Sequence, residues 1–260
     1  MIRSLWTGAS GMIAQQLSID VIANNLANVN TTGFKKSRAE FEDLMYQNLK
    51  IAGVQNVNGD RLPTGIQIGL GVRPTDVHKI FTQGDFKHTG NPLDIVIQGD
   101  GFFLLNVNGE EAYTRAGAFK PDADNRLVNA NGYPLQPEFT IPNEATNFVV
   151  TEDGRISALD SAGNELASVD IQIYTFINPA GLKAMGRNLY LAAEGSGDPI
   201  EGTPGTDNFG TLAQGYLESS NVELVDEMVS MIVGQRAYEI NSKTVTTSDE
   251  MLKMAMQLKR

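Results

Sequence analysis

The residue types that most often carry out metal or acid–base chemistry are scarce in this chain. Cysteine is absent, and the two histidines, His78 and His88, lie ten residues apart in turn- and strand-like surroundings. Without cysteine, disulfides, thiolate zinc sites and thiol catalysis are excluded. Isolated histidines are far more often solvated or packed than metal ligands or general bases. We therefore expect no metal site.

Other catalytic and cofactor motifs are also missing or incomplete. Gly99-Asp100-Gly101 and Gly69-Leu70-Gly71 do not extend to a dinucleotide-binding fingerprint, and the chain has neither a phosphate-binding GKS/GKT loop nor a Gly-x-Ser-x-Gly elbow. The acidic run 122–125 resembles the start of a calcium loop but lacks its glycine and its later glutamate, so it predicts a hairpin turn. We expect no catalytic residue, no cofactor and no enzymatic activity.

The charge of the chain is concentrated in its middle. The 260 residues carry 20 Lys+Arg against 31 Asp+Glu, a net charge of -11, and residues 100–207 hold about 16 acidic and 6 basic side chains. A net-acidic chain is a poor partner for the phosphates of nucleic acid. No apolar run reaches about 20 residues, and Thr7, Ser10 and Gln15 interrupt any signal-peptide core, so we expect neither membrane insertion nor a cleaved signal.

Apolar residues recur at seven-residue intervals near both ends of the chain, which predicts helices over residues 3–28 and 222–258. The expected packing residues are Leu5, Met12, Ile19, Ile22, Leu26, Leu217, Leu224, Met228, Met231, Tyr238, Val245 and Leu252. Residues 219–221 offer N-cap side chains, and Asp226 and Glu227 suit the positive end of the second helix. One apolar stripe cannot stabilise an isolated helix. The simplest partner is the other terminus, in either direction; the plain alternative is that the two helices pack onto the core of the same chain, and the sharper one is that the stripes are buried between subunits of a polymer.

The middle of the chain has the pattern of antiparallel β-structure. Short β-rich runs at 94–97, 101–105, 147–150 and 169–176 are separated by turn dipeptides at 58–59, 100–101, 108–109, 131–132 and 153–154. We expect an α+β fold in which coiled-coil-like N- and C-terminal helices flank an inserted antiparallel β-domain. The expected division is a discontinuous helical core domain (1–30 and 217–260), an extended connector (31–83) and a β-domain (84–216).

An asparagine-rich stretch ends the first predicted helix. Residues 23–35 read ANNLANVNTTGFK, and asparagine is a poor helix former that makes side-chain hydrogen bonds readily. A glycine there can take a left-handed turn as the chain leaves the helix. The plain interpretation is a polar helix end; the functional one is a band that fixes register among packed helices, formed by Asn24, Asn25, Asn28, Asn30, Gly33 and Phe34.

This stretch closely resembles the signature of the flagellar rod and hook family, the axial proteins of the bacterial basal body. The resemblance continues at residues 41–47, 69–74, 82–86, 93–103, 113–119, 214–222, 228–229 and 235–243. Chain length, residues 41–47 and the Gly-Val-Arg-Pro stretch look most like the distal-rod members. Proximal-rod members and a hook-like protein are the near alternatives, although the hook protein usually has a larger β insertion.

The resemblance implies a structural subunit rather than an enzyme. Relatives polymerise helically into a hollow drive shaft that crosses the periplasm, passes torque to the hook and lets exported subunits through. It implies as partners further copies of the chain, the other rod proteins, the hook protein, the P/L-ring bushing and the flagellar type III export apparatus, with no nucleic acid. A periplasmic enzyme or a binding module built on the β-domain is the alternative from another class, but it leaves the terminal heptads unexplained.

Overall fold

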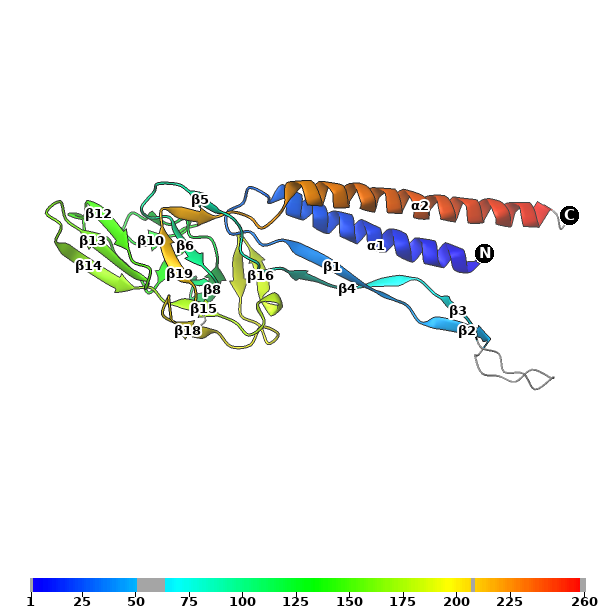
Figure 1. Ribbon diagram of the computed structural model, residues 1–260, viewed down its shortest axis with the longest axis horizontal. Coiled ribbons are helices and arrows are strands. Elements are labelled where there is room, and N and C mark those ends of the chain that lie inside the picture. Colours follow the sequence, from blue (N-terminus) through cyan, green and yellow to red (C-terminus); the bar gives the residue numbers. More distant parts are fainter. Residues whose placement is uncertain (1, 51–63, 207–208, 258–260) are drawn as a thin grey trace. The chain divides into compact units, whose positions relative to one another are not determined.

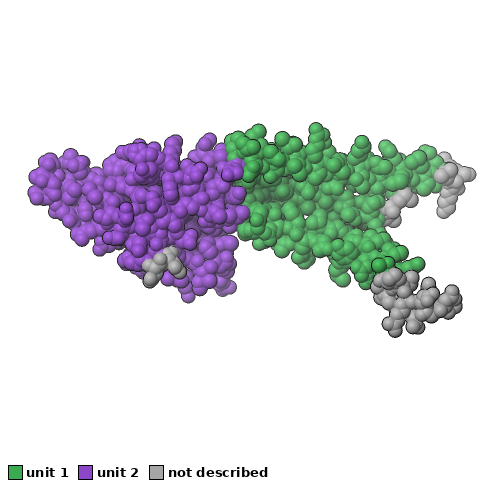
Figure 2. All heavy atoms as spheres, viewed as in Figure 1, with its two compact units in different colours: residues 1–26, 37–78, 224–260 green, residues 27–36, 79–223 purple. Residues whose placement is uncertain are grey.

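The computed structural model describes residues 2–50, 64–206 and 209–257, which form two compact units (Figure 2). Unit 1 comprises residues 1–26, 37–78 and 224–260, and unit 2 comprises residues 27–36 and 79–223. Two terminal helices and a β-rich middle confirm the predicted α+β class (Figure 1). Within the described ranges, neither helix is long and apolar enough to cross a membrane.

Unit 1 contains both long helices, with bounds close to the predicted ones. Helix α1 spans Ile2–Ala27 and helix α2 spans Leu224–Gln257. They run antiparallel, because Ser4 pairs with Ser248 near one end of the seam and Asn25 reaches Glu227 near the other. Asp226 and Glu227 lie in the first turn of α2, as expected. The helix begins after the predicted N-cap residues 219–221, which belong to unit 2.

The seam between α1 and α2 is made of small side chains. A Cβ placed on Gly8 would lie 2.8 Å from Cγ2 of Val245, and one on Gly11 would lie 2.9 Å from Nδ2 of Asn241. A Cβ on Gly234 would lie 3.2 Å from Cγ1 of Ile19. The hydroxyls of Ser4 and Ser248 are 3.1 Å apart. Contacts this short allow the two backbones to approach closely and leave no room for large side chains at these positions.

A β ribbon accompanies the helices in unit 1. Strand β1 (Ser37–Asp43) pairs with β4 (Val72–Lys79), and β2 (Tyr46–Lys50) pairs antiparallel with β3 (Ile66–Gly69). Ser10 touches the ribbon, since its hydroxyl accepts a hydrogen bond from the backbone N–H of Val72. The segment expected to be an extended connector is therefore largely a paired ribbon. The predicted turn at 58–59 lies outside the described residues.

Unit 2 is an assembly of short antiparallel sheets. The largest has the order β11-β7-β8-β17-β16, a second has the order β12-β13-β14, and the remaining strands form the pairs β5–β20, β6–β19, β9–β10 and β15–β18. A short 3-10 helix covers Pro179–Gly181. The strands are β5 (Phe86–His88), β6 (Ile95–Gln98), β7 (Phe103–Val107), β8 (Glu110–Thr114), β9 (Lys120–Pro121), β10 (Leu127–Val128), β11 (Leu135–Gln136), β12 (Asn147–Val150), β13 (Arg155–Leu159), β14 (Glu165–Asp170), β15 (Ile173–Thr175), β16 (Lys183–Gly186), β17 (Leu189–Leu191), β18 (Ile200–Gly202), β19 (Thr211–Gln214) and β20 (Tyr216–Glu218).

One apolar core joins these sheets. Alternate residues of neighbouring strands point into it, among them Phe103 and Leu105 on β7, Ile156 and Ala158 on β13, and Leu212 on β19. Several predicted turns form as expected: Asn108 and Gly109 both have positive φ in the β7–β8 hairpin, and residues 122–125 connect β9 to β10. The run 169–176 was predicted as one strand, but it divides between the end of β14 and β15.

The structure divides the chain differently from the expected domain ranges. Residues 27–36 and 79–83 belong to the β unit, whereas 37–78 belong with the helices. The assignment of Leu217 to a packing helix was wrong. Leu217 lies in β20, where it pairs with Lys87 of β5, and the ladder continues through Glu218. This strand pairing holds the chain in extended form, so the helix begins only at Leu224.

The close seam predicts whether a larger side chain at Gly8 stabilises or destabilises the helix pair. Replacing glycine by leucine inside a helix normally stabilises it by about 0.8–1 kcal/mol. In Gly8→Leu the new side chain must instead displace Val245, and overpacking of this kind costs about 1–3 kcal/mol. We expect Gly8→Leu to lower the thermal midpoint of the helical circular-dichroism signal, whereas Thr7→Leu, at an exposed neighbouring position, should leave it unchanged or raise it. A rise in both variants would contradict the close seam.

Candidate assembly surface and buried ionic cluster

Helix α2 carries a row of large apolar side chains that nothing in unit 1 covers. Val225 is 69 % exposed and Ile240 65 %, although both side chains are wholly hydrocarbon. The exposed apolar residues of α2 are Leu224, Val225, Met228, Val229, Ile232, Val233, Tyr238, Ile240, Met251, Met254 and Met256. Exposed apolar side chains that gather on one helix mark candidate interaction sites, and here they are densest over residues 224–233, so this surface is a candidate assembly interface.

Most of the exposed row faces away from the seam of α2, whereas Tyr238 and Met256 lie nearer to it. At 3.6 residues per turn, Val225, Val229 and Ile232 share one face, and the seam residues Gly234 and Asn241 fall half a turn away. Helix α1 adds exposed apolar residues of its own, because Trp6 is 73 % exposed and Ile13 is 64 % exposed. The pair α1/α2 is therefore packed on the inside and still apolar on the outside. We call these exposed residues of α1 and α2 the outer apolar face.

The predicted packing residues divide between the two faces. Half-buried positions are Leu5, Met12, Ile19, Ile22, Leu26, Met231, Val245 and Leu252, while Leu224, Met228 and Tyr238 are exposed. The heptad positions predicted from the sequence do not include the exposed residues Val225, Val229, Ile232, Val233 and Ile240. These residues follow one another at intervals of four, three, one and seven, which places them on one side of a helix. The sequence alone contains this pattern.

Residues of the predicted polar band make several hydrogen bonds within the chain. Asn25 is buried, and its amide group binds both backbone groups of Ser37 at 2.8 and 2.9 Å, which fastens the start of β1 to α1. Asn28 accepts a hydrogen bond from the Thr31 hydroxyl, and the Asn24 and Asn30 side chains are exposed. The Asn25 side chain therefore makes these hydrogen bonds within unit 1. The wider role in subunit register stays a prediction.

A buried ionic cluster lies in unit 2, where residues from five segments meet. Glu218 accepts a hydrogen bond from Nζ of Lys35 at 2.6 Å and one from Nε of Arg115 at 3.0 Å. The Lys35 side chain is 0 % exposed, that of Glu218 1 % and that of Arg115 4 %. The backbone N–H of Gly84 also donates to Glu218, at 3.0 Å. One carboxylate thus serves two buried cations.

Backbone carbonyls complete the coordination of both cations. Lys35 donates to the carbonyl of Thr82 at 2.7 Å, and Nη1 of Arg115 donates to the carbonyls of Gly99 and Gly101 at 2.8 and 2.6 Å. Burial lowers the pKa of the Lys35 ammonium below its ordinary value, although the adjacent Glu218 carboxylate opposes the shift. A buried charge is tolerated only when it is paired and hydrogen-bonded, so these carbonyls are part of the cluster.

The last residues of the asparagine-rich stretch bring Lys35 into place. Gly33 adopts φ +69°, and a Cβ there would lie 2.7 Å from the backbone N of Ala116, so the position requires glycine. Its N–H donates to the carbonyl of Glu218 at 2.8 Å. Phe34 is buried, with Nζ of Lys79 4.8 Å from the centre of its ring. Gly33 and Phe34 therefore help to position the ionic cluster within unit 2, and their role in register among packed helices stays a prediction.

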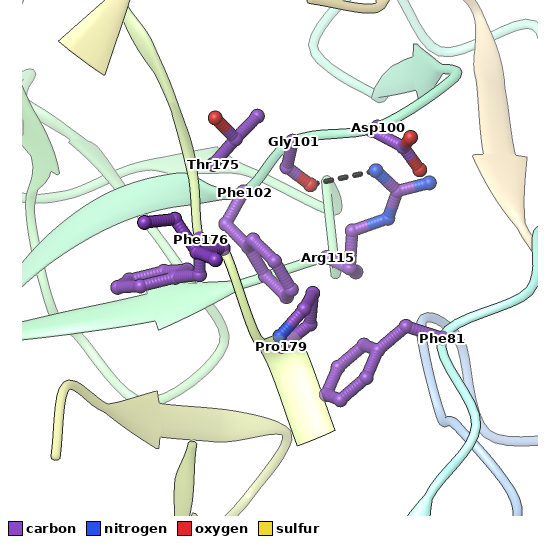
Figure 3. Close-up of a pocket in the computed structure, with 9 residues that line it drawn as sticks. Phe81, Asp100, Gly101, Phe102, Arg115, Thr175, Phe176 and Pro179 are labelled. Carbon is purple, nitrogen blue, oxygen red and sulfur yellow. Dashed lines mark hydrogen bonds between the residues drawn. The ribbon is translucent and has the colours of Figure 1, made fainter. Parts of the chain in front are cut away.

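A pocket of about 340 Å³ borders this cluster (Figure 3). Phe81, Phe102 and Pro179 form its apolar side, and Arg115 points toward the carbonyl of Gly101. Nε of Arg115 is engaged by Glu218 and Nη1 by two carbonyls, so these two groups hold the ionic cluster together.

Comparisons with known proteins match the whole length of the chain. Three family models match in order: the flagella basal body rod protein at residues 5–35, the flagellar hook protein FlgE/F/G D1 domain at 96–158, and the flagellar basal body rod FlgEFG protein C-terminal at 213–258. The flagellar basal-body rod protein FlgG of Borreliella burgdorferi is 48 % identical over 100 % of both chains. That of Buchnera aphidicola subsp. Acyrthosiphon pisum is 46 % identical over 99 % of this chain and 100 % of the relative.

The chain belongs to the flagellar rod and hook family. Its relatives are structural proteins of the basal-body rod, which confirms the predicted family and the expectation that the chain is not an enzyme. A crystal structure of Helicobacter pylori flagellar hook protein FlgE2 is also similar, at 18 % identity, covering 71 % of this chain and 43 % of that chain with a TM-score of 0.24.

The ionic cluster and the helix pair contain several of the residues that carry the family resemblance. Gly33 and Lys35 end the N-terminal signature, Arg115 lies in the stretch 113–119, and Glu218 lies in the stretch 214–222. These three separate stretches meet at the ionic cluster. The exposed Val229 and the seam residue Asn241 lie in the C-terminal stretches 228–229 and 235–243.

The ionic cluster predicts that a single isosteric substitution of Glu218 strongly lowers the stability of unit 2. Glu218→Gln keeps the shape of the side chain but leaves Lys35 and Arg115 buried without a counter-charge, which costs about 3–5 kcal/mol. We expect urea unfolding followed by tyrosine fluorescence to show this loss. Glu165→Gln is the control, because Glu165 pairs with Arg155 in an exposed ion pair of the same unit; that variant should unfold near the wild-type midpoint. Equal midpoints for both variants would contradict the structural role of Glu218.

Proposed function

We propose that the protein is a subunit of the distal rod of the flagellar basal body. It polymerises helically into a hollow shaft that transmits torque to the hook and allows exported subunits to pass. The observation that carries this proposal is the outer apolar face, on helices that match the rod family at both ends of the chain. The FlgG relatives, which are basal-body rod proteins, are similar over the full length and favour the distal rod over a proximal-rod or hook-like subunit.

The energetics of the outer apolar face favour assembly. Apolar surface gains about 25 cal/mol per Å² when it leaves water. Because both helices carry exposed apolar residues, one subunit can bury them against more than one neighbour. Head-to-tail contacts that do not close into a ring produce a helical filament. The heptad spacing of the half-buried residues supports coiled-coil-like packing among the terminal helices of neighbouring subunits.

The distribution of charge suits an inner helical layer and an outer β layer. The ends of the chain are nearly neutral, whereas residues 100–207 carry about 16 acidic and 6 basic side chains. Like charges repel least when they face solvent, which supports placing the β unit in the outer wall of the shaft. The proposed partners are further copies of the chain, the other rod proteins, the hook protein, the P/L-ring bushing and the type III export apparatus.

The β ribbon is our candidate for setting the stiffness of the shaft. Its described part exposes Met45, Tyr46, Leu49, Ile66 and Ile68. A ribbon that bridges neighbouring subunits would bury these side chains and oppose bending. The candidate segment 46–70 includes residues 51–63, which lie outside the described residues.

The proposal predicts that charge on the outer apolar face blocks polymerisation. Val229→Asp and Val233→Asp each place a carboxylate where neighbouring subunits would bury it, and an unpaired buried charge is strongly unfavourable. We expect sedimentation and electron microscopy to find monomers only, with a circular-dichroism spectrum like that of the wild type.

Asn131→Asp is the control, because it adds the same charge at an exposed polar turn of unit 2 that is no part of the outer apolar face; it should polymerise normally. Filaments of normal length from both valine variants would contradict the proposal.

A further inference from the structure

Three side chains able to bind a metal gather on the paired strands β1 and β4. Glu40 lies on β1, and Asp76 and His78 lie on β4. One ligand atom from each lies within 4.8 Å of the other two. Nδ1 of His78 is 3.2 Å from Oδ1 of Asp76, and Nε2 of His78 is 3.9 Å from Oε1 of Glu40. The imidazole is thus flanked by two carboxylates.

The strand geometry explains why these residues converge. Successive side chains of a strand point to opposite faces, so Asp76 and His78, two residues apart, share one face of β4. Glu40 reaches the same face from the neighbouring strand. His78 is half-buried, with a side chain 22 % exposed, while both carboxylates keep contact with solvent. The half-buried His78 would hold a metal ion in a fixed position, and the two exposed carboxylates would leave the ion a path from solvent.

The chemistry of the donors selects a class of metal. One imidazole nitrogen and two carboxylate oxygens suit zinc better than calcium or magnesium, which prefer oxygen ligands alone. Zinc binds three protein groups at about 2.0–2.2 Å and completes a tetrahedron with water. One ion binds only one of the two ring nitrogens, so the carboxylate that faces the other nitrogen would have to turn toward it, which the exposed side chains of Glu40 and Asp76 allow.

We propose that Glu40, Asp76 and His78 bind one Zn²⁺ ion, which cross-links β1 to β4. An isolated two-stranded ribbon is only marginally stable in water, so a metal bridge between its strands would hold it together. The proposal changes the expectation that His78 is no metal ligand, and it does not depend on the proposed function. Arg38 competes for the site, because its Nη2 lies 2.6 Å from Oε1 of Glu40.

The composition of the chain makes the site easy to test. With no cysteine and only two histidines, His88 provides a matched control; its ring packs edge-on against Tyr216, 5.0 Å between centroids. We expect calorimetric titration of Zn²⁺ into the full-length protein to give one site per chain. Loss of an outer-sphere partner alone weakens metal sites about 10–100-fold, so His78→Ala should weaken binding at least about tenfold. His88→Ala should bind like the wild type.

Two milder variants and a direct readout guard against a folding defect in His78→Ala. Glu40→Gln should weaken binding, and Arg38→Gln, which removes the competing cation, should strengthen it. In the proton spectrum of the wild type, zinc should shift the ring signals of one histidine, and His78→Ala should remove that histidine's signals. Equal weakening by His78→Ala and His88→Ala, no effect of either, or no shift of a histidine ring would overturn the proposal.

Discussion

The close approach of α1 and α2 is the constraint on which unit 1 depends. Gly8, Gly11 and Gly234 occupy the seam because a Cβ at any of them would lie within 3.2 Å of the opposite helix. The seam packs glycines of one helix against larger side chains of the other, such as Val245 and Ile19. Other large apolar side chains, among them Val225, Val229 and Trp6, remain exposed and form the surface that we propose a neighbouring subunit buries.

Unit 2 depends on a different kind of interaction. Its core is apolar, but Lys35, Arg115 and Glu218 add a buried cluster in which one carboxylate pairs with both cations and backbone carbonyls accept their other hydrogen bonds. Such clusters contribute little net stability compared with apolar packing, yet removing one partner leaves an uncompensated buried charge and is strongly destabilising. Here the cluster fixes the segment that follows α1 and the strand that precedes α2, both within the same unit.

The sequence predicted the elements better than their contacts. Periodicity located both helices within about two residues, and the Asn108-Gly109 hairpin formed where its turn chemistry required. The heptad rule searches for large apolar residues, so it selected Met228 and Tyr238, which are exposed, and overlooked the glycines that make the seam. Lys35 and Glu218 are 183 residues apart, and no local pattern reveals such a pair. Leu217 followed the heptad but joined a strand, because its pairing with β5 overrides the local pattern.

The central claim is that the outer apolar face is open in the free subunit and covered in the rod. Hydroxyl-radical footprinting of monomer and polymer tests it directly, because Trp6, Met228 and Met254 are readily oxidised and exposed in the free chain. The account predicts rapid oxidation of all three in the monomer and strong protection in the polymer. Equal oxidation rates in the two states would show that assembly uses another surface, and would contradict the account.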